Sequence, residues 1–467
     1  MGQRPIKDHT DKERTEYMSK TIAALSTPSA HSAIAVIRLS GEDAINIADS
    51  IFRPSYIESI KQLSGYHAAH GRIIFEGKTL DEVVALVFKA PRSYTGENMV
   101  EFSCHGNPKI AARIVAACIA AGASPAGAGE FTRRAFENGK LDLSQAEAIA
   151  ELIESESERA ASAAVSRRDG ELGRRIDAIS DELSFTAAKL AVWSDYPEEE
   201  DAPFVTREEL LEVFEKTSAE LCELIANYNT GRLIQNGIRI AIAGSPNVGK
   251  STLTNLLSGS ERSIVTDIAG TTRDVVEAPA EIEGISQRLL DTAGIRDTDD
   301  TVEKIGVRRA REAVEQSDLV LFVIDASRGV TTEDEEIYDQ IKSRPHIVVY
   351  NKNDLAPKSF QHNIKPDVEI SAALGSGIDE LKKAVKSALG LNLSQEGCLI
   401  ASQRQFDCVL RAKKALDEAV FQLNGGVTLD VVGILLEEAV APLAELTGRS
   451  ASEAVIEQVF ANFCVGK

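Results

Sequence analysis

The stretch RIAIAGSPNVGKSTLTNLL (239–257) decides the fold of the central part of the chain. It begins with an apolar run typical of a buried strand, continues with the spacing G-x-x-x-x-G-K-S, and ends in residues of helical composition. This order predicts a phosphate-binding loop, because glycines let backbone N–H groups point at phosphate oxygens and the following helix adds the positive end of its dipole. A chance match in a glycine-rich turn is the alternative, and the strand before and the helix after argue against it.

Two side chains of this loop are expected to act directly on a bound nucleotide. Lys250 would reach the β- and γ-phosphates, which makes it a candidate catalytic residue, and Ser251 would offer its hydroxyl to Mg²⁺. The residues expected to contact the nucleotide here are Asn247, Val248, Gly249, Lys250, Ser251 and Thr252.

Two further motifs, each after an apolar run, indicate which nucleotide is bound. RLLDTAG (288–294) places Asp291 where an outer ligand of Mg²⁺ belongs, and the N–H of Gly294 can contact the γ-phosphate. HIVVYNKND (346–354) ends in Asp354, whose carboxylate can accept two N–H donors that guanine has and adenine lacks; an Asn/Asp turn after a strand is the alternative. The combination predicts GTP, with candidate contacts Asp291, Thr292, Ala293, Gly294, Asn351, Lys352, Asp354 and, in VEISAALGSG (368–377), Ser371 and Ala372.

The segment TDIAGTTRD (266–274), which by composition is an ordinary polar loop, lies between the first two motifs. A threonine here, Thr272, can complete Mg²⁺ coordination only when the γ-phosphate is present, which makes a switch. The residue after DTAG is Ile295 rather than a glutamine that could orient the attacking water, so the site needs another source of catalysis. The candidate GTP contacts in this loop are Thr266, Asp267, Ile268, Ala269, Gly270, Thr271 and Thr272.

The charge of the chain is unevenly distributed. Of the net −21, residues 1–140 carry +2, residues 237–390 carry −6, and the remaining segments together carry −17. Gripping nucleic acid requires basic surface, so any RNA is expected to contact the first domain or another subunit. No apolar run approaches the ~18 residues of a membrane span, and no secretory leader is visible. Six cysteines without paired spacing predict neither disulfides nor zinc, so we expect a cytoplasmic protein without membrane contact.

These patterns divide the chain into five segments. Short apolar runs and a helical stretch predict a compact α+β domain over 19–140, and the polar residues 1–18 are expected to be a disordered extension. Residues 141–236 and 391–467 are helical, and the simplest interpretation joins them into one discontinuous all-α domain with the nucleotide domain, 237–390, inserted into it. Helix starts with reciprocal side-chain caps are expected at Ser144 with Glu147 and at Ser450 with Glu453.

Further blocks of sequence carry a resemblance to a known family. SYTGENMVEFSCHGN (93–107), GEFTRRAFENGKLDLSQAEAIAELI (129–153) and the closing Cys464-Val465-Gly466-Lys467 stand beside GSPNVGKST, TDIAGTTRD, DTAG and NKND. Over residues 19–467 the chain resembles the MnmE (TrmE) family of tRNA modification GTPases. The GTPase motifs alone fit many translation-associated GTPases, whereas the first blocks and the closing C-x-G-K are specific to this family.

The resemblance implies a multidomain α/β protein: an N-terminal α+β domain that dimerises and binds 5-formyltetrahydrofolate or a related folate, a discontinuous helical domain, and an inserted Ras-like P-loop G domain. It implies a GTP hydrolase that needs Mg²⁺ and K⁺. It also implies a heterotetramer with the FAD-containing partner MnmG, which adds a 5-carboxymethylaminomethyl-type group to the wobble uridine of tRNA with folate as one-carbon donor.

The resemblance also assigns residues by motif position. Arg38, Glu101 and Lys140 match folate contacts, and their charges suit a glutamate tail and a pterin edge, although each could equally be a surface charge. Lys467 is placed beside the folate. Cys464 is a candidate functional cysteine, and an incidental cysteine at a helix end is the alternative.

Potassium takes the place of an arginine finger in the family, which would account for the missing glutamine. The potassium ligands implied by motif position are Asn247, Thr266, Ile268 and Thr271. Glu303 is implied to position the attacking water through a second water, although a glutamate at a helix start is also favoured by the dipole.

Two positions depart from the family pattern. The segment Pro28–Ala33 lacks the usual glycines, and Asn98 stands where aspartate is common. The rival function is a ribosome-assembly GTPase that acts as an RNA-binding switch, which would share the GTPase motifs but usually carries a basic RNA-binding domain.

Overall fold

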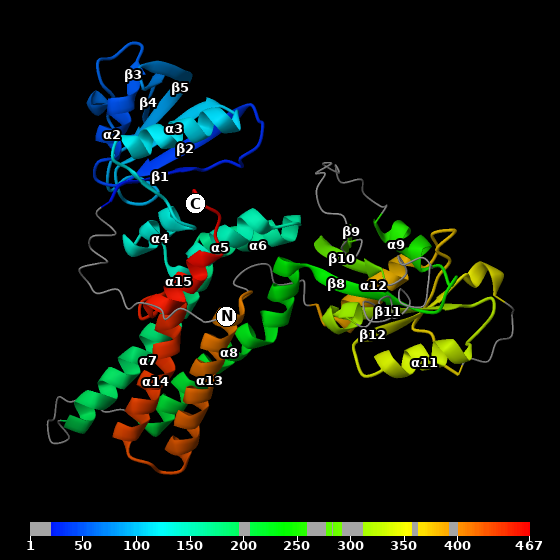
Figure 1. Ribbon diagram of the computed structural model, residues 1–467. Helices are drawn as coiled ribbons and strands as arrows, with labels where there is room; N and C mark the ends of the chain where they lie inside the picture. The colour runs from blue at the N-terminus through cyan, green and yellow to red at the C-terminus, as the bar shows by residue number, and fades with distance from the viewer. Residues whose placement is uncertain are drawn as a thin grey trace, which may run out of the picture. The chain divides into compact units, whose positions relative to one another are not determined.

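A computed structural model describes residues 20–195, 206–258, 277–282, 284–291, 312–356, 363–391 and 400–467. The chain forms two compact units, residues 1–150 with 444–467 and residues 151–443 (Figure 1). Among the described residues, no helix is both long and apolar enough to cross a membrane.

The first unit is built on a seven-stranded sheet. Its strand order is β3 (Phe52–Pro54), β4 (His67–Phe75), β5 (Lys78–Phe88), β6 (Met99–His105), β2 (Ile34–Ser40), β1 (Ile22–Leu25) and β7 (Ser124–Pro125). All neighbours are antiparallel except β1 and β7.

One face of this sheet is packed along most of its strands, and the other is covered only in part, where Ile22 and Ala24 of β1 pack with Phe131. Inward residues alternate along β2 and β5, as the two-residue period of a strand requires. They bury against the helices α2 (Ala44–Ile51) and α3 (Pro108–Ala120), for example Ile37 and Phe102 against Ile114. On the opposite face, Ile34 and Val84 are 59% and 42% exposed.

Three helices and the end of the sequence complete the first unit. These helices are α4 (Glu130–Glu137), the start of α5 (Leu143–Glu154) and α15 (Glu453–Ala461). Leu143 and Ala146 pack with Ile456 and Phe460 in one apolar cluster. The last residues are tied in by backbone bonds, from the Phe131 N–H to the Lys467 carbonyl (3.1 Å) and from the Gly129 N–H to the Cys464 carbonyl (3.3 Å).

Both expected capping boxes are wrong by two residues. At α5 the reciprocal pair is Asp142 with Gln145, whose backbone and side chains exchange bonds of 2.8 and 2.9 Å. The Ser144 hydroxyl instead donates to Asp142, because a carboxylate is the stronger acceptor. At α15 the cap is Ser452, and the Ser450 N–H is used by the preceding helix through the Ala444 carbonyl (3.3 Å).

The second unit contains long helices that pack side by side. They are α6 (Glu158–Arg168), α7 (Glu171–Asp195), α8 (Arg207–Asn236), α13 (Gln403–Asn424) and most of α14 (Leu429–Thr447). Tyr228 of α8 stacks on Phe406 of α13 with ring centroids 4.3 Å apart. The buried Arg167 of α6 donates to Glu151 of α5 and to the Gln235 side chain of α8 (2.9 Å). These bonds join α6 to α5 and to the end of α8.

A six-stranded sheet follows α8 directly. Its order is β13 (Val368–Glu369), β12 (His346–Asn351), β11 (Leu319–Asp325), β8 (Ile238–Ala243), β10 (Ile285–Asp291) and β9 (Glu277–Ile282), parallel except for β9. The helices α9 (Lys250–Ser258) and α12 (Ile378–Ala388) cover one face, and α11 (Thr332–Ile341) covers the other. Every residue of β11 is buried, as a central parallel strand requires.

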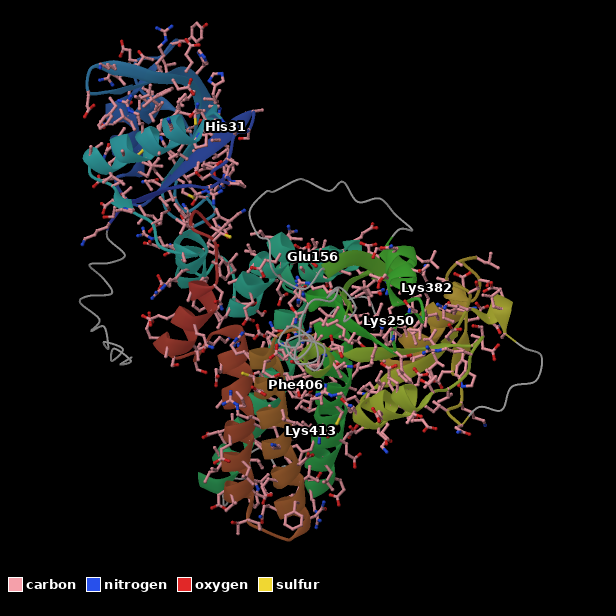
Figure 2. The ribbon with its side chains drawn as sticks, turned by 45° about the vertical axis from the view of Figure 1, so that its right-hand side comes forward. His31, Glu156, Lys250, Lys382, Phe406 and Lys413 are labelled. Atoms are coloured by element: carbon pink, nitrogen blue, oxygen red, sulfur yellow. The ribbon has the colours of Figure 1, made fainter. Side chains whose placement is uncertain are left out.

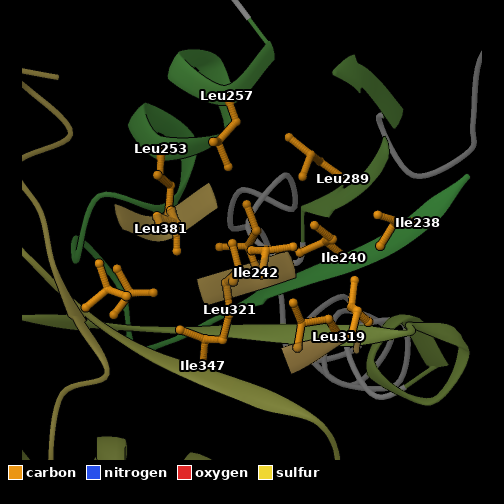
Figure 3. Packing of buried hydrophobic residues seen from close by; sticks show 14 of the residues in the cluster. Ile238, Ile240, Ile242, Leu253, Leu257, Leu289, Leu319, Leu321, Ile347 and Leu381 are labelled. Atoms are coloured by element: carbon orange, nitrogen blue, oxygen red, sulfur yellow. The ribbon is translucent and has the colours of Figure 1, made fainter. Parts of the chain in front are cut away.

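The packing of the α9 and α12 face is seen in Figure 3, where Leu253, Leu257 and Leu381 meet Ile240, Ile242 and Leu321 of the sheet. Because β8, β11 and β12 are parallel neighbours, they end at the same edge of the sheet, and the loops that follow them lie together there.

Candidate functional site

The loop between β8 and α9 has a backbone that two glycines make possible. Gly244 has φ +150° and Gly249 has φ +96°, values that favour glycine. A Cβ on Gly244 would lie 2.2 Å from the Val323 carbonyl oxygen, and one on Gly249 would lie 2.3 Å from Nδ2 of Asn351. The loop can therefore curl against the sheet edge only with glycine at both positions.

Side chains of the NKND motif hold this loop in place. Nδ2 of Asn351 donates to the Val248 carbonyl (2.8 Å), and Nζ of Lys352 donates to the Asn247 carbonyl (2.8 Å). Oδ1 of Asn351 in turn accepts from the Ala372 N–H (2.9 Å). The three loops that the sequence predicted to share one nucleotide are thus joined directly.

Asp325, at the end of β11, is a contributor that the sequence motifs missed. Its carboxylate accepts from Nζ of Lys352 (2.7 Å) and from the hydroxyl and N–H of Ser327 (2.6 and 2.9 Å). Burial by itself would raise the pKa of Asp325, but the bonds from Lys352 and Ser327 outweigh burial and keep the pKa below its usual value. Asp325 thus remains ionised and fixes Lys352 beside the loop.

Lys250 and Ser251 lie at the start of α9, where phosphates are expected (Figure 2 labels Lys250). Nζ of Lys250 donates to the carbonyls of Gly244 (2.6 Å) and Ser245 (2.9 Å), so the ammonium group is folded over the loop. Ser251 and Thr252 are exposed on the first turn. An exposed hydroxyl, an ammonium group and the N-terminal end of the helix make this end of α9 suited to a polyphosphate.

The other described candidates lie around the same edge. Asp291 ends β10 in register with Ile242 of β8, two residues before the glycine loop begins. Asp354 is exposed in the short 3-10 helix Asn353–Leu355, and Ser371 and Ala372 are buried beside Asn351. The remaining candidates, Thr266, Asp267, Ile268, Ala269, Gly270, Thr271, Thr272, Thr292, Ala293, Gly294 and Glu303, lie outside the described residues.

The loop is also held through the buried side chain of Ser245, which bonds to the buried Asp334 and to the exposed Arg328. The Ser245 hydroxyl donates to Oδ1 of Asp334 (2.6 Å) and accepts from the guanidinium of Arg328. Sequence reasoning missed this group, although Thr331 and Asp334 have the spacing of a helix start and β11 predicts that the following loop lies at the binding edge.

The first unit brings two of the predicted folate residues into contact. Arg38 of β2 and Glu101 of β6 are register partners, and Nε of Arg38 donates to Glu101 (2.8 Å) with both side chains about one-fifth exposed. The guanidinium also lies 5.5 Å from the ring centre of Tyr94 and 5.6 Å from that of Phe131. Burial raises the pKa of Tyr94 above its usual value, although Thr132 and Arg38 oppose the shift.

The other candidates of the first unit lie around this pair. The Arg38 guanidinium reaches the Gly466 carbonyl at 3.5 Å, next to Lys467. Nζ of Lys140 donates to the Pro91 carbonyl (3.2 Å), in the segment that also carries Tyr94. Cys464 is exposed, and its carbonyl accepts from the N–H groups of Gly129 and Lys467.

The two departures from the family pattern are both anchored. The glycine-free segment Pro28–Ala33 is held by Gly106, which accepts from the Ser32 N–H (3.0 Å) and donates to the Ala33 carbonyl (3.3 Å). Asn98 accepts from the Ala90 N–H through Oδ1 (3.1 Å).

A parallel sheet with a glycine loop, NKND and SAA segments at one edge defines a P-loop GTPase. Two family descriptions match the chain, the GTP-binding protein TrmE N-terminus over residues 21–140 and the MnmE helical domain over residues 143–464. The chain belongs to the MnmE family of tRNA modification GTPases.

Relatives of known name agree with this assignment. The tRNA modification GTPase MnmE of Aquifex aeolicus is 40% identical, over 96% of this chain and 100% of its own length. The protein of the same name from Thermus thermophilus is 42% identical, over 96% of this chain and 99% of its own length. A crystal structure of Era from Aquifex aeolicus bound to GDP.AlF4⁻ is 34% identical over 38% of this chain and 65% of that chain, with a TM-score of 0.26.

Proposed function

We propose that this chain couples potassium-activated GTP hydrolysis to modification of the wobble uridine of tRNA, together with a FAD-containing MnmG partner and a formyl-tetrahydrofolate as one-carbon donor. The observation that carries the GTPase part is the direct joining of the glycine loop, NKND and SAA segments through Asn351 and Lys352. The rest extends from membership of a family whose relatives are named tRNA modification GTPases.

The described residues support distinct steps of hydrolysis. Asp354 would accept two N–H donors of guanine and so select GTP. Lys250 would exchange its two loop carbonyls for phosphate oxygens, a stronger pairing because the acceptors are charged. Water then attacks the γ-phosphorus, the bond to the bridging oxygen breaks, and Lys250 stabilises the charge that develops on the phosphates.

The donor set of the loop fits metal ions that prefer oxygen. Ser251 presents a hydroxyl, and with Thr272 it would hold Mg²⁺. Asn247 is exposed on the loop, and with Thr266, Ile268 and Thr271 it would hold K⁺. These ions would supply positive charge near the transferred phosphoryl group, where the chain has no glutamine after DTAG. Glu303 would position the attacking water.

A folate site is proposed around the Arg38–Glu101 pair of the first unit. The pair offers one cation and one carboxylate beside the aromatic rings of Tyr94 and Phe131, which suits a flat heterocycle with an anionic tail. Lys140 and Lys467 would add positive charge. Cys464 is exposed next to this group and is available to a reactive one-carbon unit.

Exposed apolar residues and the distribution of charge support the proposed protein and tRNA partners. The exposed apolar residues Ile34 of β2 and Val84 of β5 lie on the same sheet face, on either side of β6, and they support a homodimer through the first unit because exposed apolar surface favours association. The acidic helical segments disfavour direct contact with tRNA phosphates, so the first unit or MnmG would hold the tRNA in the cytoplasm.

The whole proposal is tested in cells that lack this protein. Wobble uridine modification in bulk tRNA, measured by mass spectrometry, should disappear and return with the wild-type chain but not with Lys250→Ala. If the depleted cells kept the wild-type level of wobble uridine modification, the tRNA role would be refuted and only the GTPase activity would remain. The full-length family match favours this function over the ribosome-assembly alternative, which instead predicts nucleotide-dependent binding to ribosomal subunits.

The potassium assignment is tested separately with purified protein. GTP turnover should be much faster in KCl than in NaCl at equal ionic strength. Equal rates in the two salts would remove potassium from the proposal without affecting the guanine assignment.

A further inference from the structure

The glycine loop is held to the rest of the domain at three places. Two of them use the NKND motif, from Lys352 to the Asn247 carbonyl and from Asn351 to the Val248 carbonyl. The third is the side chain of Ser245, which lies on the other side of Asn247 and bonds to Asp334 and Arg328. Asn247 is therefore held from both directions along the chain.

The hydrogen bond between Ser245 and Asp334 is buried, and both carboxylate oxygens of Asp334 accept hydrogen bonds. Ser245 and Asp334 are 1% and 0% exposed. Oδ2 of Asp334 is occupied by the N–H and hydroxyl of Thr331 (3.0 and 2.7 Å), which caps α11, so Oδ1 is the atom left for Ser245. One carboxylate thus starts a helix and fastens the glycine loop, and Arg328 lies 3.7 Å from its Oδ2.

Asn247 needs such support because of its backbone. Its φ is +63°, in the left-handed region that residues other than glycine adopt at a cost of roughly 1 kcal/mol or more, least for asparagine. Its side chain is exposed, so no packing fixes its direction. Its position is restricted by the bond from Lys352 to its carbonyl, by the bond from Asn351 to the Val248 carbonyl, and by the anchored Ser245 two residues earlier.

We propose that Ser245, Asp334 and Arg328 are positioning residues that aim the Asn247 side chain at the potassium ion. This rests on the proposed potassium-activated function. The phosphate-binding residues that follow Asn247 have their own anchor at Val248 and their own helix, α9. Loss of the Ser245 contact should therefore weaken potassium binding and leave nucleotide binding largely intact.

The test uses Ser245→Ala in the full chain. The probe is a fluorescent GDP with aluminium fluoride and Mg²⁺, whose complex is titrated with KCl at equilibrium, so that binding rather than turnover is measured. The half-saturating K⁺ concentration should rise about threefold to tenfold, the scale expected when a ligand loses preorganisation. The dissociation constant for GDP alone should change by less than about twofold.

Two further variants separate positioning from folding. Thr331→Ala removes the helix-cap partner of Asp334 but leaves the Ser245 contact, so it should lower Tm without moving the K⁺ titration. Arg328→Gln removes the donor to Ser245 but leaves the Ser245–Asp334 bond, so it should raise the half-saturating K⁺ concentration by less than Ser245→Ala does.

The outcomes distinguish this inference from the function on which it rests. A wild-type complex that forms equally well in NaCl overturns both. A potassium-dependent wild type with an unchanged Ser245→Ala titration, or with an equal shift in Thr331→Ala, overturns the positioning role alone. A parallel loss of GDP and K⁺ affinity in Ser245→Ala also overturns it, because the contact would then be a general support of the loop.

Discussion

The two candidate sites of this molecule are built in different ways. In the nucleotide site, neighbouring loops at one sheet edge are joined by bonds to backbone carbonyls, as from Asn351 to Val248 and from Lys352 to Asn247. In the first unit, Arg38 meets Glu101, which lies 63 positions away, and Gly466, which lies 428 positions away. The bonds of the nucleotide site also join distant positions, 103 and 105 apart, but their residues belong to short motifs that the sequence displays. The second arrangement has no such motif and depends on strand register and on the closing residues of the chain.

This difference shows when a functional site can be predicted from a sequence motif. The residues of the glycine loop that contact the nucleotide follow one another in the sequence, so the motif and this part of the site nearly coincide. The Arg38–Glu101 pair exists only because β2 and β6 align in one register, and a shift of one strand by one residue would place the two side chains on opposite faces of the sheet. Four predictions test this contrast.

The largest effect is expected for Lys250→Ala. The variant loses charge-assisted bonds to two phosphates, each worth about 1.5–3 kcal/mol, so GTP affinity or turnover should fall by about 100-fold or more. Tm should change little, because the lost partners in the unliganded loop are two carbonyls near the surface. Lys383→Ala, on the exposed side of α12, removes the same charge and should change neither quantity.

A smaller effect is expected for Asp354→Asn. An amide presents a donor where the carboxylate accepted, so GTP affinity should fall about tenfold to 100-fold and xanthosine triphosphate should become the better ligand. Competition binding with the two nucleotides measures this. An unchanged preference for GTP would mean that other residues bind the guanine base. The NKND motif would then predict the site no better than the sequence predicts the Arg38–Glu101 site.

The next effect concerns the register-built site. Arg38→Ala leaves Glu101 without its partner, so folate affinity should fall about tenfold while GTP turnover is retained. Arg72→Ala is the matched control, because Arg72 pairs with Glu82 across neighbouring strands of the same sheet but with both side chains at least half exposed. That variant should change stability by less than about 1 kcal/mol and leave folate binding alone. Equal losses in the two variants would contradict the folate assignment.

The smallest effect is a dependence of stability on pH in the nucleotide domain. The pKa of Asp325 is lowered in the folded state, so its contribution to the free energy of unfolding is present above its unfolded pKa of about 4 and is lost as pH falls through the folded value. Urea midpoints measured between about pH 5 and about pH 3 should therefore fall less in Asp325→Asn than in the wild type. If the urea midpoint of Asp325→Asn fell more steeply than that of the wild type, the pKa of Asp325 would not be lowered in the folded state.

Much of the fold followed from apolar runs with clear ends. The apolar runs at 34–41, 100–106 and 239–244 form β2, β6 and β8, and the stretch of helical composition at 109–123 forms most of α3. The helix starts were less readable, because a polar stretch such as Asp142-Leu-Ser144-Gln145 offers several caps and only the geometry decides that the carboxylate prevails. Ser245 and Asp334 were missed because Ser245 is one of the unspecified positions of G-x-x-x-x-G-K-S and Asp334 lies outside the nucleotide motifs, so no pattern pairs them.

The tying of residues 444–467 to the first unit has a consequence for synthesis on the ribosome. The apolar surfaces of Leu143 and Ala146 cannot meet Ile456 and Phe460 until residues 151–443 have been translated, which takes about 15–60 s at typical bacterial rates. During that interval the GTPase domain can already be folded while part of the N-terminal unit stays open. A chaperone that shields apolar helices would have this interval in which to act on the unpaired start of α5.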